Sequence, residues 1–235
     1  MNDIDYLKKY YKGNIDDAIK RYENGEPVQY IVGDVDFYGN IIKVDKRALI
    51  PRRETEELVE KTLRYLNNTN LDVVDLGTGT GCIAITLKKK LPNINMDAVD
   101  ISKDALDLAI ENAKINNVEI NFYNGNMLEP LNKKYDCIIS NPPYIPYDEE
   151  VMDIVKNNEP HLALFADNNG YYFYEEIIKN SKNYLKDKFI IAFEIGYNQG
   201  DKLKQIANTY YKNAKVLIEK DMQGFDRFCF IIGEL

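Results

Sequence analysis

The chain has 235 residues, of which 45% are hydrophobic and 29% are charged, and its formal net charge is −8. Its apolar runs are shorter than the roughly 20 residues of a membrane-spanning helix, and its first residues, MNDIDYLKKYYKG, lack a signal-peptide core, so a soluble, cytoplasmic protein is expected. The lysines are scattered along the chain, which argues against a partner bound mainly through phosphates.

The cysteines and the single histidine narrow the possible chemistry. Cys82, Cys137 and Cys229 are far apart and have apolar neighbours, so they are expected to be buried free thiols. His161 is the only histidine, which leaves at most one candidate for a Ser-His-Asp triad or a site with several histidine ligands. We therefore expect no metal site and no catalysis that depends on histidine relays.

The first fifth of the chain contains two predicted parts. Residues 1–27 are predicted to form a short helical segment, because apolar side chains recur there at spacings of three and four residues. Residues 28–50 contain three β-rich runs, QYIVG, VDFYG and NIIKVD, which are separated by glycine-containing turns. This pattern predicts a β-hairpin that links the helical segment to the rest of the chain.

From residue 51 to residue 235, short apolar strands alternate with amphipathic helices. The helix TEELVEKTLRYL begins the series, with Thr55 as its expected cap, and Ser102 is the expected N-cap of a later helix. Such alternation predicts an α/β domain with a doubly wound, parallel sheet covered by helices on both faces. The last two strands, AKVLIEKD and RFCFIIG, are too close for a helical crossover, so an antiparallel hairpin is expected.

A glycine-rich loop, Asp75-Leu76-Gly77-Thr78-Gly79-Thr80-Gly81, follows a predicted strand and precedes a predicted helix. Glycines in this position let a ligand approach the backbone closely. Asp100 ends the next predicted strand, where its carboxylate can accept hydrogen bonds from both ribose hydroxyls of an adenosine. The pattern predicts a nucleoside site, and a tight turn with a helix-capping Asp100 is the structural alternative.

Nicotinamide dinucleotides and S-adenosyl-L-methionine (AdoMet) both satisfy this arrangement. Gly81 comes one position earlier than the third glycine of the G-x-G-x-x-G register that usually binds a diphosphate. A second glycine fingerprint is absent downstream, so only one adenosine half is specified. The loop therefore favours AdoMet.

The motif Asn141-Pro142-Pro143-Tyr144 follows the predicted strand YDCIIS, at the carboxyl edge of the sheet where ligands bind in such folds. The prolines stiffen the turn and present the Pro142 carbonyl outward. This oxygen and the side-chain oxygen of Asn141 can each accept one hydrogen of a planar NH2 group, while the Tyr144 ring can pack on its face. Both hydrogen bonds strengthen as the nitrogen becomes positive during methyl transfer, which would lower the barrier.

Three structural alternatives exist for the same motif: a proline turn that ends a strand, a polyproline ligand for another domain, and a loop without a role. The motif lies inside a folded pattern and begins 60 residues after Gly81, within reach of the same sheet edge. We therefore interpret it as the part of the site that holds an amide or amino nitrogen.

At these motifs the sequence resembles the release factor glutamine methyltransferases. The resemblance covers about residues 23–232 and includes DLGTGTG, NPPY, GEPVQYIVG (25–33), LIPRRETEELVE (49–60) and EIGYNQG (194–200). Asp221, Gly224 and Arg227 complete it near the end of the chain. NPPY alone is shared with adenine-N6 methyltransferases, whereas four motifs in this order are specific.

The resemblance implies a class I AdoMet-dependent methyltransferase fold, which is Rossmann-like, with a seven-stranded, mostly parallel sheet and an antiparallel C-terminal hairpin. It implies AdoMet as the methyl donor, S-adenosyl-L-homocysteine as the product, and the glutamine of the GGQ motif in peptide chain release factors as the acceptor. The segment with Arg52, Glu54 and Glu57 is expected to border the active site.

The resemblance also assigns residues to the two halves of the site. The substrate glutamine is expected to contact Phe37 of the hairpin, Asn141, Pro142, Pro143 and Tyr144, among which Asn141, Pro142 and Tyr144 are the expected catalytic residues. The cofactor is expected to contact Asp75, Gly77, Thr78, Gly79, Gly81, Asp100, Ile101, Asn126, Met127 and Asn141.

Three features depart from the family pattern. About 25 residues precede the GEP motif, where the family usually has a longer helical domain that helps to bind the release factor, so substrate docking is expected to differ. Arg53 replaces the second proline of PRPETE. Asn126 replaces the aspartate that usually contacts the adenine amino group, but its oxygen can still accept a hydrogen bond, so weaker binding is expected.

The leading hypothesis is therefore methylation of the GGQ glutamine by a cytoplasmic, monomeric enzyme that has neither a membrane nor nucleic acid as a direct partner. A second hypothesis is methylation of a glutamine in a ribosomal protein or of adenine in nucleic acid. A third, from another class, is a catalytically inactive AdoMet-binding partner of translation factors.

Overall fold

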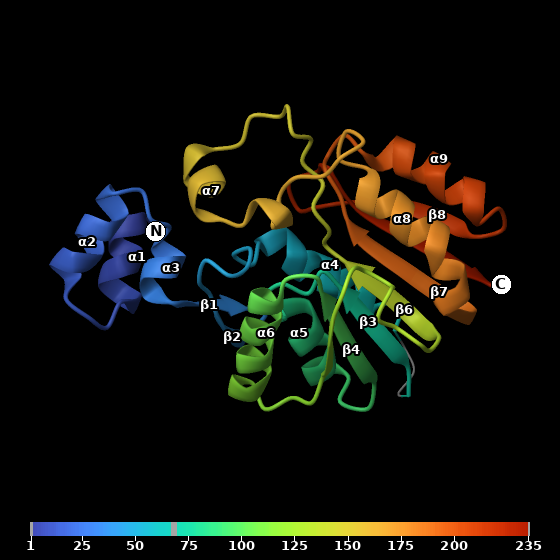
Figure 1. Ribbon diagram of the computed structural model, residues 1–235, viewed down its shortest axis with the longest axis horizontal. Coiled ribbons are helices and arrows are strands. Elements are labelled where there is room, and N and C mark those ends of the chain that lie inside the picture. Colours follow the sequence, from blue (N-terminus) through green and yellow to red (C-terminus); the bar gives the residue numbers. More distant parts are fainter. Residues whose placement is uncertain (1, 67–69, 235) are drawn as a thin grey trace.

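The computed structural model describes residues 2–66 and 70–234, which are organised around a seven-stranded sheet with the strand order β5-β4-β3-β6-β7-β9-β8 (Figure 1). The strands are β3 (Asp72–Leu76), β4 (Asn95–Asp100), β5 (Asn121–Asn124), β6 (Tyr135–Ser140), β7 (Leu185–Glu194), β8 (Lys215–Lys220) and β9 (Asp226–Glu234). β3 to β7 pair in parallel, whereas β9 is antiparallel to both β7 and β8. The predicted parallel α/β sheet and its antiparallel C-terminal hairpin are confirmed.

Helices cover both faces of this sheet. One face carries α4 (Arg53–Leu63), α5 (Cys82–Lys90) and α6 (Lys103–Ile115), and the other carries α8 (Tyr172–Asn180) and α9 (Gly200–Tyr210). Within the described ranges, none of the helices is both long and apolar enough to cross a bilayer.

Two hydrophobic cores lie on opposite sides of the sheet because side chains alternate along each strand. Val73 and Ile139 face the core beneath α4 and α5, whereas Val74 and Ile138 face the core beneath α8 and α9. Full burial of one such side chain contributes about 1.5–3 kcal/mol. The predicted burial of all three cysteines as free thiols is also confirmed.

The N-terminal helices form a small core of their own, at one end of the molecule in Figure 1. They are α1 (Asp3–Tyr10), α2 (Ile15–Glu23) and α3 (Val28–Val32). The expected strand QYIVG is wrong, because these residues form α3 and the turn after it. Val28 and Ile31, three positions apart, bury their side chains against α1 and α2, and this packing outweighs the β preference of branched residues. Gly33 then ends α3 in the left-handed conformation, at φ 93°.

A two-stranded hairpin, β1 (Asp34–Phe37) and β2 (Asn40–Lys43), follows α3. The predicted hairpin is therefore present, but it is shorter than the expected linker of residues 28–50. The side chain of Asn112 in α6 ties it to the sheet domain: Oδ1 accepts the Lys43 N–H at 2.8 Å, and Nδ2 donates to the Lys43 carbonyl at 3.0 Å. The same Nδ2 donates to the carbonyl of Thr80 in the glycine-rich loop at 2.9 Å.

Two further local expectations need correction. Arg52, and not Thr55, is the N-cap residue of α4, and Thr55 lies in the first turn with its side chain turned inward to Glu194. Ser102 does cap α6, by accepting the Ala105 N–H at 3.2 Å.

The sequence patterns predict no helix or strand in the segment directly after the NPPY motif. The structure has two elements there, α7 (Asp153–Asn158) and the short 3-10 helix η1 (His161–Ala163). A second 3-10 helix, η2 (Ser181–Tyr184), follows α8.

Asn112→Ala tests the attachment of the hairpin. The variant leaves the Lys43 N–H and the Thr80 carbonyl without their partner, and each buried unpaired group costs about 1–3 kcal/mol. We expect the free energy of unfolding to fall by about 2–4 kcal/mol. Denaturant titration measures this, with Asn95→Ala as the control, since the Asn95 side chain is exposed and bonds to Asp72 at the surface. Equal effects of the two changes would contradict the anchoring role of Asn112.

Candidate functional site

The glycine-rich loop connects the end of β3 to the start of α5. Gly77 has a backbone φ angle of 72° and Gly79 has one of 55°, values that residues with a β-carbon rarely adopt. A β-carbon built at Gly77 would meet nothing within 4 Å, and one at Gly79 would meet only the Ala48 side chain at 3.9 Å. The N–H groups of Gly77 and Thr78 are tied to the Val99 carbonyl of β4. The loop is therefore held from the sheet side and open on the other side.

Asp100 lies at the end of β4, next to this loop. Its carboxylate accepts the Gly79 N–H at 2.8 Å and the Ser102 N–H at 2.9 Å, one on each oxygen. Because a carboxylate oxygen has two acceptor sites, both oxygens can still accept a ribose hydroxyl. Burial raises the pKa of Asp100, and the two N–H groups oppose this rise. The geometry thus fits the predicted nucleoside site.

Asp75 and Gly81 support the loop from behind. Asp75 is fully buried and accepts the Thr78 hydroxyl at 2.6 Å, while its Oδ1 atom has no partner among the described residues. Burial raises the pKa of Asp75 to about 7. A β-carbon on Gly81 would come within 3.1 Å of the Ala109 side chain in α6, so this glycine is needed for helix packing. Both residues were expected to contact the cofactor, and the structure places them under the cavity wall.

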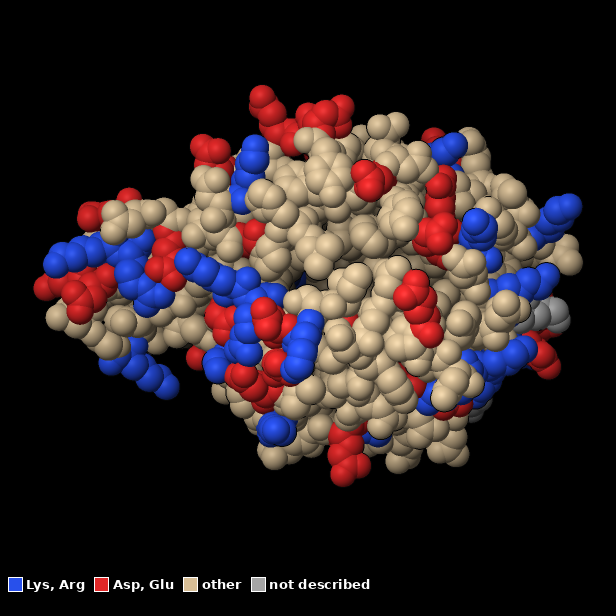
Figure 2. Space-filling view, in the orientation of Figure 1, with Lys and Arg blue, Asp and Glu red and all other residues tan. Residues whose placement is uncertain are grey.

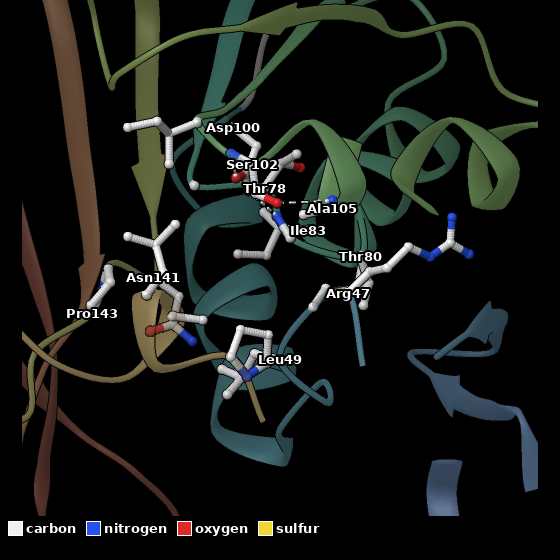
Figure 3. A pocket seen from close by; sticks show the side chains of 18 of the residues that line it. Arg47, Leu49, Thr78, Thr80, Ile83, Asp100, Ser102, Ala105, Asn141 and Pro143 are labelled. Carbon is white, nitrogen blue, oxygen red and sulfur yellow. Dashed lines mark hydrogen bonds between the residues drawn. The ribbon is translucent and has the colours of Figure 1, made fainter. Parts of the chain in front are cut away.

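A cavity opens in front of the loop, and Figure 3 shows Thr78 and Asp100 on one side of it and Asn141 with Pro143 on another. Its lining comes from segments that are far apart in the sequence. They are residues 47–49, 51 and 52 before α4, Thr55 in its first turn, residues 77–80 of the glycine-rich loop, Cys82 and Ile83 at the start of α5, residues 100–102 with Ala105, residues 126–127, Asn141 with Pro143, Pro160 with Leu162 and Ala163, and Phe173.

Ile101, Asn126 and Met127, which are predicted to contact the cofactor, line the same cavity. Asn126 donates from Nδ2 to Glu129 at 3.2 Å, which leaves its Oδ1 atom available as an acceptor. Met127 adopts a left-handed conformation, with φ 47°. The departure from the family aspartate therefore keeps an acceptor oxygen at this position but removes its charge.

Asn141 follows the last residue of β6 and lies at the cavity wall. Its Nδ2 donates to the Thr55 hydroxyl at 3.1 Å. Neither its Oδ1 atom nor the Pro142 carbonyl oxygen has a hydrogen-bond partner in residues 2–66 and 70–234. The two expected acceptors are thus both unengaged.

Tyr144 and Phe37 are placed differently from the other expected substrate contacts. The Tyr144 ring packs against the core beneath α8 and α9, its hydroxyl lies 3.5 Å from Glu194, and burial raises its pKa. Phe37 is fully buried in the core beneath α4 and α5. The structure therefore brings Asn141 and Pro143 to the cavity wall, whereas Tyr144 and Phe37 lie behind it.

The sequence did not predict three residues at the site. Thr55 lines the cavity, and its hydroxyl donates a hydrogen bond to Glu194 at the end of β7. Buried Glu159 accepts a hydrogen bond from the Arg52 guanidinium at 2.5 Å. The rule that identified Asp100 could have found Glu194, because it also ends an apolar strand at the carboxyl edge of the sheet. The Arg52–Glu159 ion pair carries no comparable local signal, since its residues lie 107 positions apart.

Comparison with known proteins places the chain in a family. The Methyltransferase small domain family matches residues 55–163. The release factor glutamine methyltransferase of Streptococcus pneumoniae is 44% identical over 219 residues, which cover 92% of this chain and 78% of that protein. The chain belongs to the release factor glutamine methyltransferases. A second member of this methyltransferase family, from Enterococcus faecalis, is 46% identical over 204 residues, which cover 86% of this chain and 74% of the relative.

A solved structure supports the class I methyltransferase fold of this family member. The methyltransferase from Pyrococcus furiosus superimposes with a TM-score of 0.65 at 16% identity, over 84% of this chain and 91% of that one. At this identity the similarity concerns the fold alone.

Asp100→Ala tests the cofactor half of the site in this methyltransferase. If Asp100 accepts the ribose hydroxyls as predicted, the change removes charge-assisted hydrogen bonds that are each worth about 1.5–3 kcal/mol, so AdoMet affinity should fall at least about tenfold. Isothermal titration calorimetry measures the affinity. Asp104→Ala is the control, because Asp104 is an exposed acid in the first turn of the next helix. An Asp100→Ala protein with the affinity of the parent would exclude this role.

Proposed function

We propose that this chain transfers a methyl group from AdoMet to the side-chain amide nitrogen of the glutamine in the GGQ motif of peptide chain release factors. The observation that carries the proposal is the pair of unengaged acceptors, Asn141 Oδ1 and the Pro142 carbonyl oxygen, in a motif whose Asn141 and Pro143 line the same cavity as Asp100 and the glycine-rich loop. The relatives of 44% and 46% identity carry the name of this activity.

The chemistry of an amide explains why two acceptors are needed. The nitrogen lone pair of glutamine is delocalised into its carbonyl group, so the nitrogen is a weak nucleophile. AdoMet supplies a methyl group on a positively charged sulfur, and displacement there requires chiefly in-line positioning. Asn141 Oδ1 and the Pro142 carbonyl would each accept one hydrogen of the NH2 group. They would fix its rotation and stabilise the positive charge that develops on nitrogen as the N–CH3 bond forms and the CH3–S bond breaks. The methylated nitrogen then loses one of its two protons to water, which restores the neutral amide.

The same geometry supports a proposal for how the chain would bind the cofactor. Asp100 would accept the ribose hydroxyls, Gly77 and Gly79 would let the ligand approach the backbone, and Asn126 would accept from the adenine amino group through Oδ1. Asp75 would act from beneath, by fixing Thr78 in the loop. The product of the cofactor would be S-adenosyl-L-homocysteine.

The charge distribution supports a protein acceptor. Acidic and basic side chains are interspersed over the face shown in Figure 2, and the net charge of the chain is −8. Binding mainly through phosphates would require a concentrated basic surface. We infer from these charges that the acceptor is a protein, and we propose separately that the enzyme acts in the cytoplasm as a monomer.

Asn141→Ala tests the amide clamp. Loss of one preorganised contact of this kind typically costs about 10²–10³ in turnover, while AdoMet binding should survive. Single-turnover rates at saturating AdoMet measure the effect. Asn141→Asp is the sharper variant, because it keeps an acceptor but adds a negative charge that must be desolvated, so turnover should again fall. An Asn141→Ala enzyme within about threefold of the parent would contradict the clamp.

Mass spectrometry of candidate acceptors after incubation with AdoMet tests the substrate itself. We expect one added methyl group on the GGQ glutamine of a release factor. A methyl group on adenine or on a ribosomal protein, with none on the GGQ glutamine, would overturn the proposal. Binding of AdoMet without transfer to any of these acceptors would favour an inactive AdoMet-binding partner.

A further inference from the structure

The asparagine side chain of the NPPY motif has a donor end and an acceptor end, and only the acceptor end can receive a hydrogen from a substrate NH2 group. Nδ2 and Oδ1 of Asn141 are nearly equal in size, so packing alone does not choose between the two orientations. A hydrogen bond to one end must therefore decide which atom faces the substrate.

The deciding hydrogen bond comes from a buried chain of three residues. Glu194 accepts the Thr55 hydroxyl at 2.7 Å through Oε2, and Thr55 Oγ1 lies 3.1 Å from Asn141 Nδ2. An ionised carboxylate can only accept, so the single hydroxyl proton of Thr55 is committed to Glu194. Thr55 Oγ1 can then only accept from Asn141, and this fixes Nδ2 towards Thr55 and Oδ1 away from it.

The fold holds these residues with little freedom. Ser140 of β6 is in register with Phe193 of β7, so the residues that follow them, Asn141 and Glu194, lie side by side at the sheet edge. Thr55 reaches them from the first turn of α4, which packs against β7. Thr55 is 3% exposed and Glu194 is 2% exposed, so water does not compete for the hydrogen bond between them.

We propose that Thr55 and Glu194 are positioning residues that hold the Asn141 amide with Oδ1 facing the acceptor nitrogen. The proposal rests on the proposed function, because it assigns the two residues to the same methyl transfer. They act through Asn141 and need no contact with the glutamine. Their loss should lower turnover and leave AdoMet affinity almost unchanged.

The surroundings of Glu194 make the hydrogen-bond chain sensitive to protonation. Arg52, Glu54 and Thr55 face it from the start of α4, Arg227 from β9, Tyr144 from the NPPY motif, Tyr174 from α8 and Cys82 from α5. Burial raises the pKa of Glu194 to about 7, whereas the Thr55 hydroxyl and the two arginines lower it.

Protonation of Glu194 would reverse the hydrogen-bond chain. A protonated Glu194 could donate to Thr55, and the Thr55 hydroxyl would then donate its own proton to Asn141 Oδ1. The amide would rotate and present its donor end to the substrate.

Thr55→Val is the first test, because valine keeps the shape of threonine and removes the hydroxyl. Misplacement of a reacting group can cost about 10²-fold, so we expect single-turnover rates on a GGQ-containing release factor to fall by about 10–100-fold. AdoMet affinity by calorimetry should stay within about threefold, well under the effect of losing a direct contact. Thr55→Ser restores the hydroxyl and should recover most of the lost rate.

Thr62→Val provides the matched control. Thr62 lies in the same helix, is fully buried, and donates its hydroxyl to the Leu58 carbonyl of its own helix. The single-turnover rate of Thr62→Val should stay within about twofold of the parent rate, since the Thr62 hydroxyl bonds within its own helix and not to the site. Equal losses in Thr55→Val and Thr62→Val, or no recovery in Thr55→Ser, would overturn the positioning role. A parent enzyme that fails to methylate the GGQ glutamine would instead defeat the proposed function itself.

Glu194→Gln tests the protonation step. In the parent enzyme the single-turnover rate should fall as the pH drops through about 7, since the ionised Glu194 is the form that orients Thr55. Glutamine keeps an acceptor oxygen for Thr55 and does not titrate, so this fall should disappear in the variant. Asp75 is buried with a pKa near the same value, and it remains in the variant. An unchanged pH profile in Glu194→Gln would overturn the role of Glu194 ionisation and point to Asp75.

Discussion

Parallel pairing of β3 with β4 on one side and β6 on the other is the constraint on which the site depends. Leu76 is in register with Val99 and Ser140, so the residues that follow these three strand positions emerge at the same edge of the sheet. The glycine-rich loop, Asp100 and Asn141 converge there although they are far apart in the sequence. A slip of one residue in either pairing would turn the side chains to the opposite faces and separate these groups.

Buried carboxylates organise this edge. Asp75 fixes Thr78, Asp100 holds the Gly79 backbone, and Glu159 ties Arg52 to the segment after α7. Each carboxylate is removed from water, which is costly unless hydrogen bonds replace its hydration. The bonded groups are therefore fixed in place, as a reaction that depends mainly on positioning requires.

Strong periodic patterns predicted the sheet well, because alternation of apolar strands with long amphipathic helices leaves few alternative topologies. The weaker predictions concern short segments near the N-terminus and after the NPPY motif. QYIVG has the composition of a strand but folds as α3, since Val28 and Ile31 find a core against α1 and α2. Short segments of this kind follow their tertiary contacts more than their own propensity.

The sequence by itself determined the α/β class and the family. It also predicts where the nucleoside half of the site lies, because glycines and a strand-ending acid carry local constraints that need no distant partner. The tertiary structure alone decided how the acceptor half is built. The sequence pattern predicts Thr55 as a helix cap, and only the tertiary structure shows that its hydroxyl donates to Glu194, 139 residues away. Likewise, Phe37 and Tyr144 lie behind the cavity wall, since their rings pack into the two cores. Such contacts between distant segments depend on strand register and helix packing, which no local pattern of residues specifies.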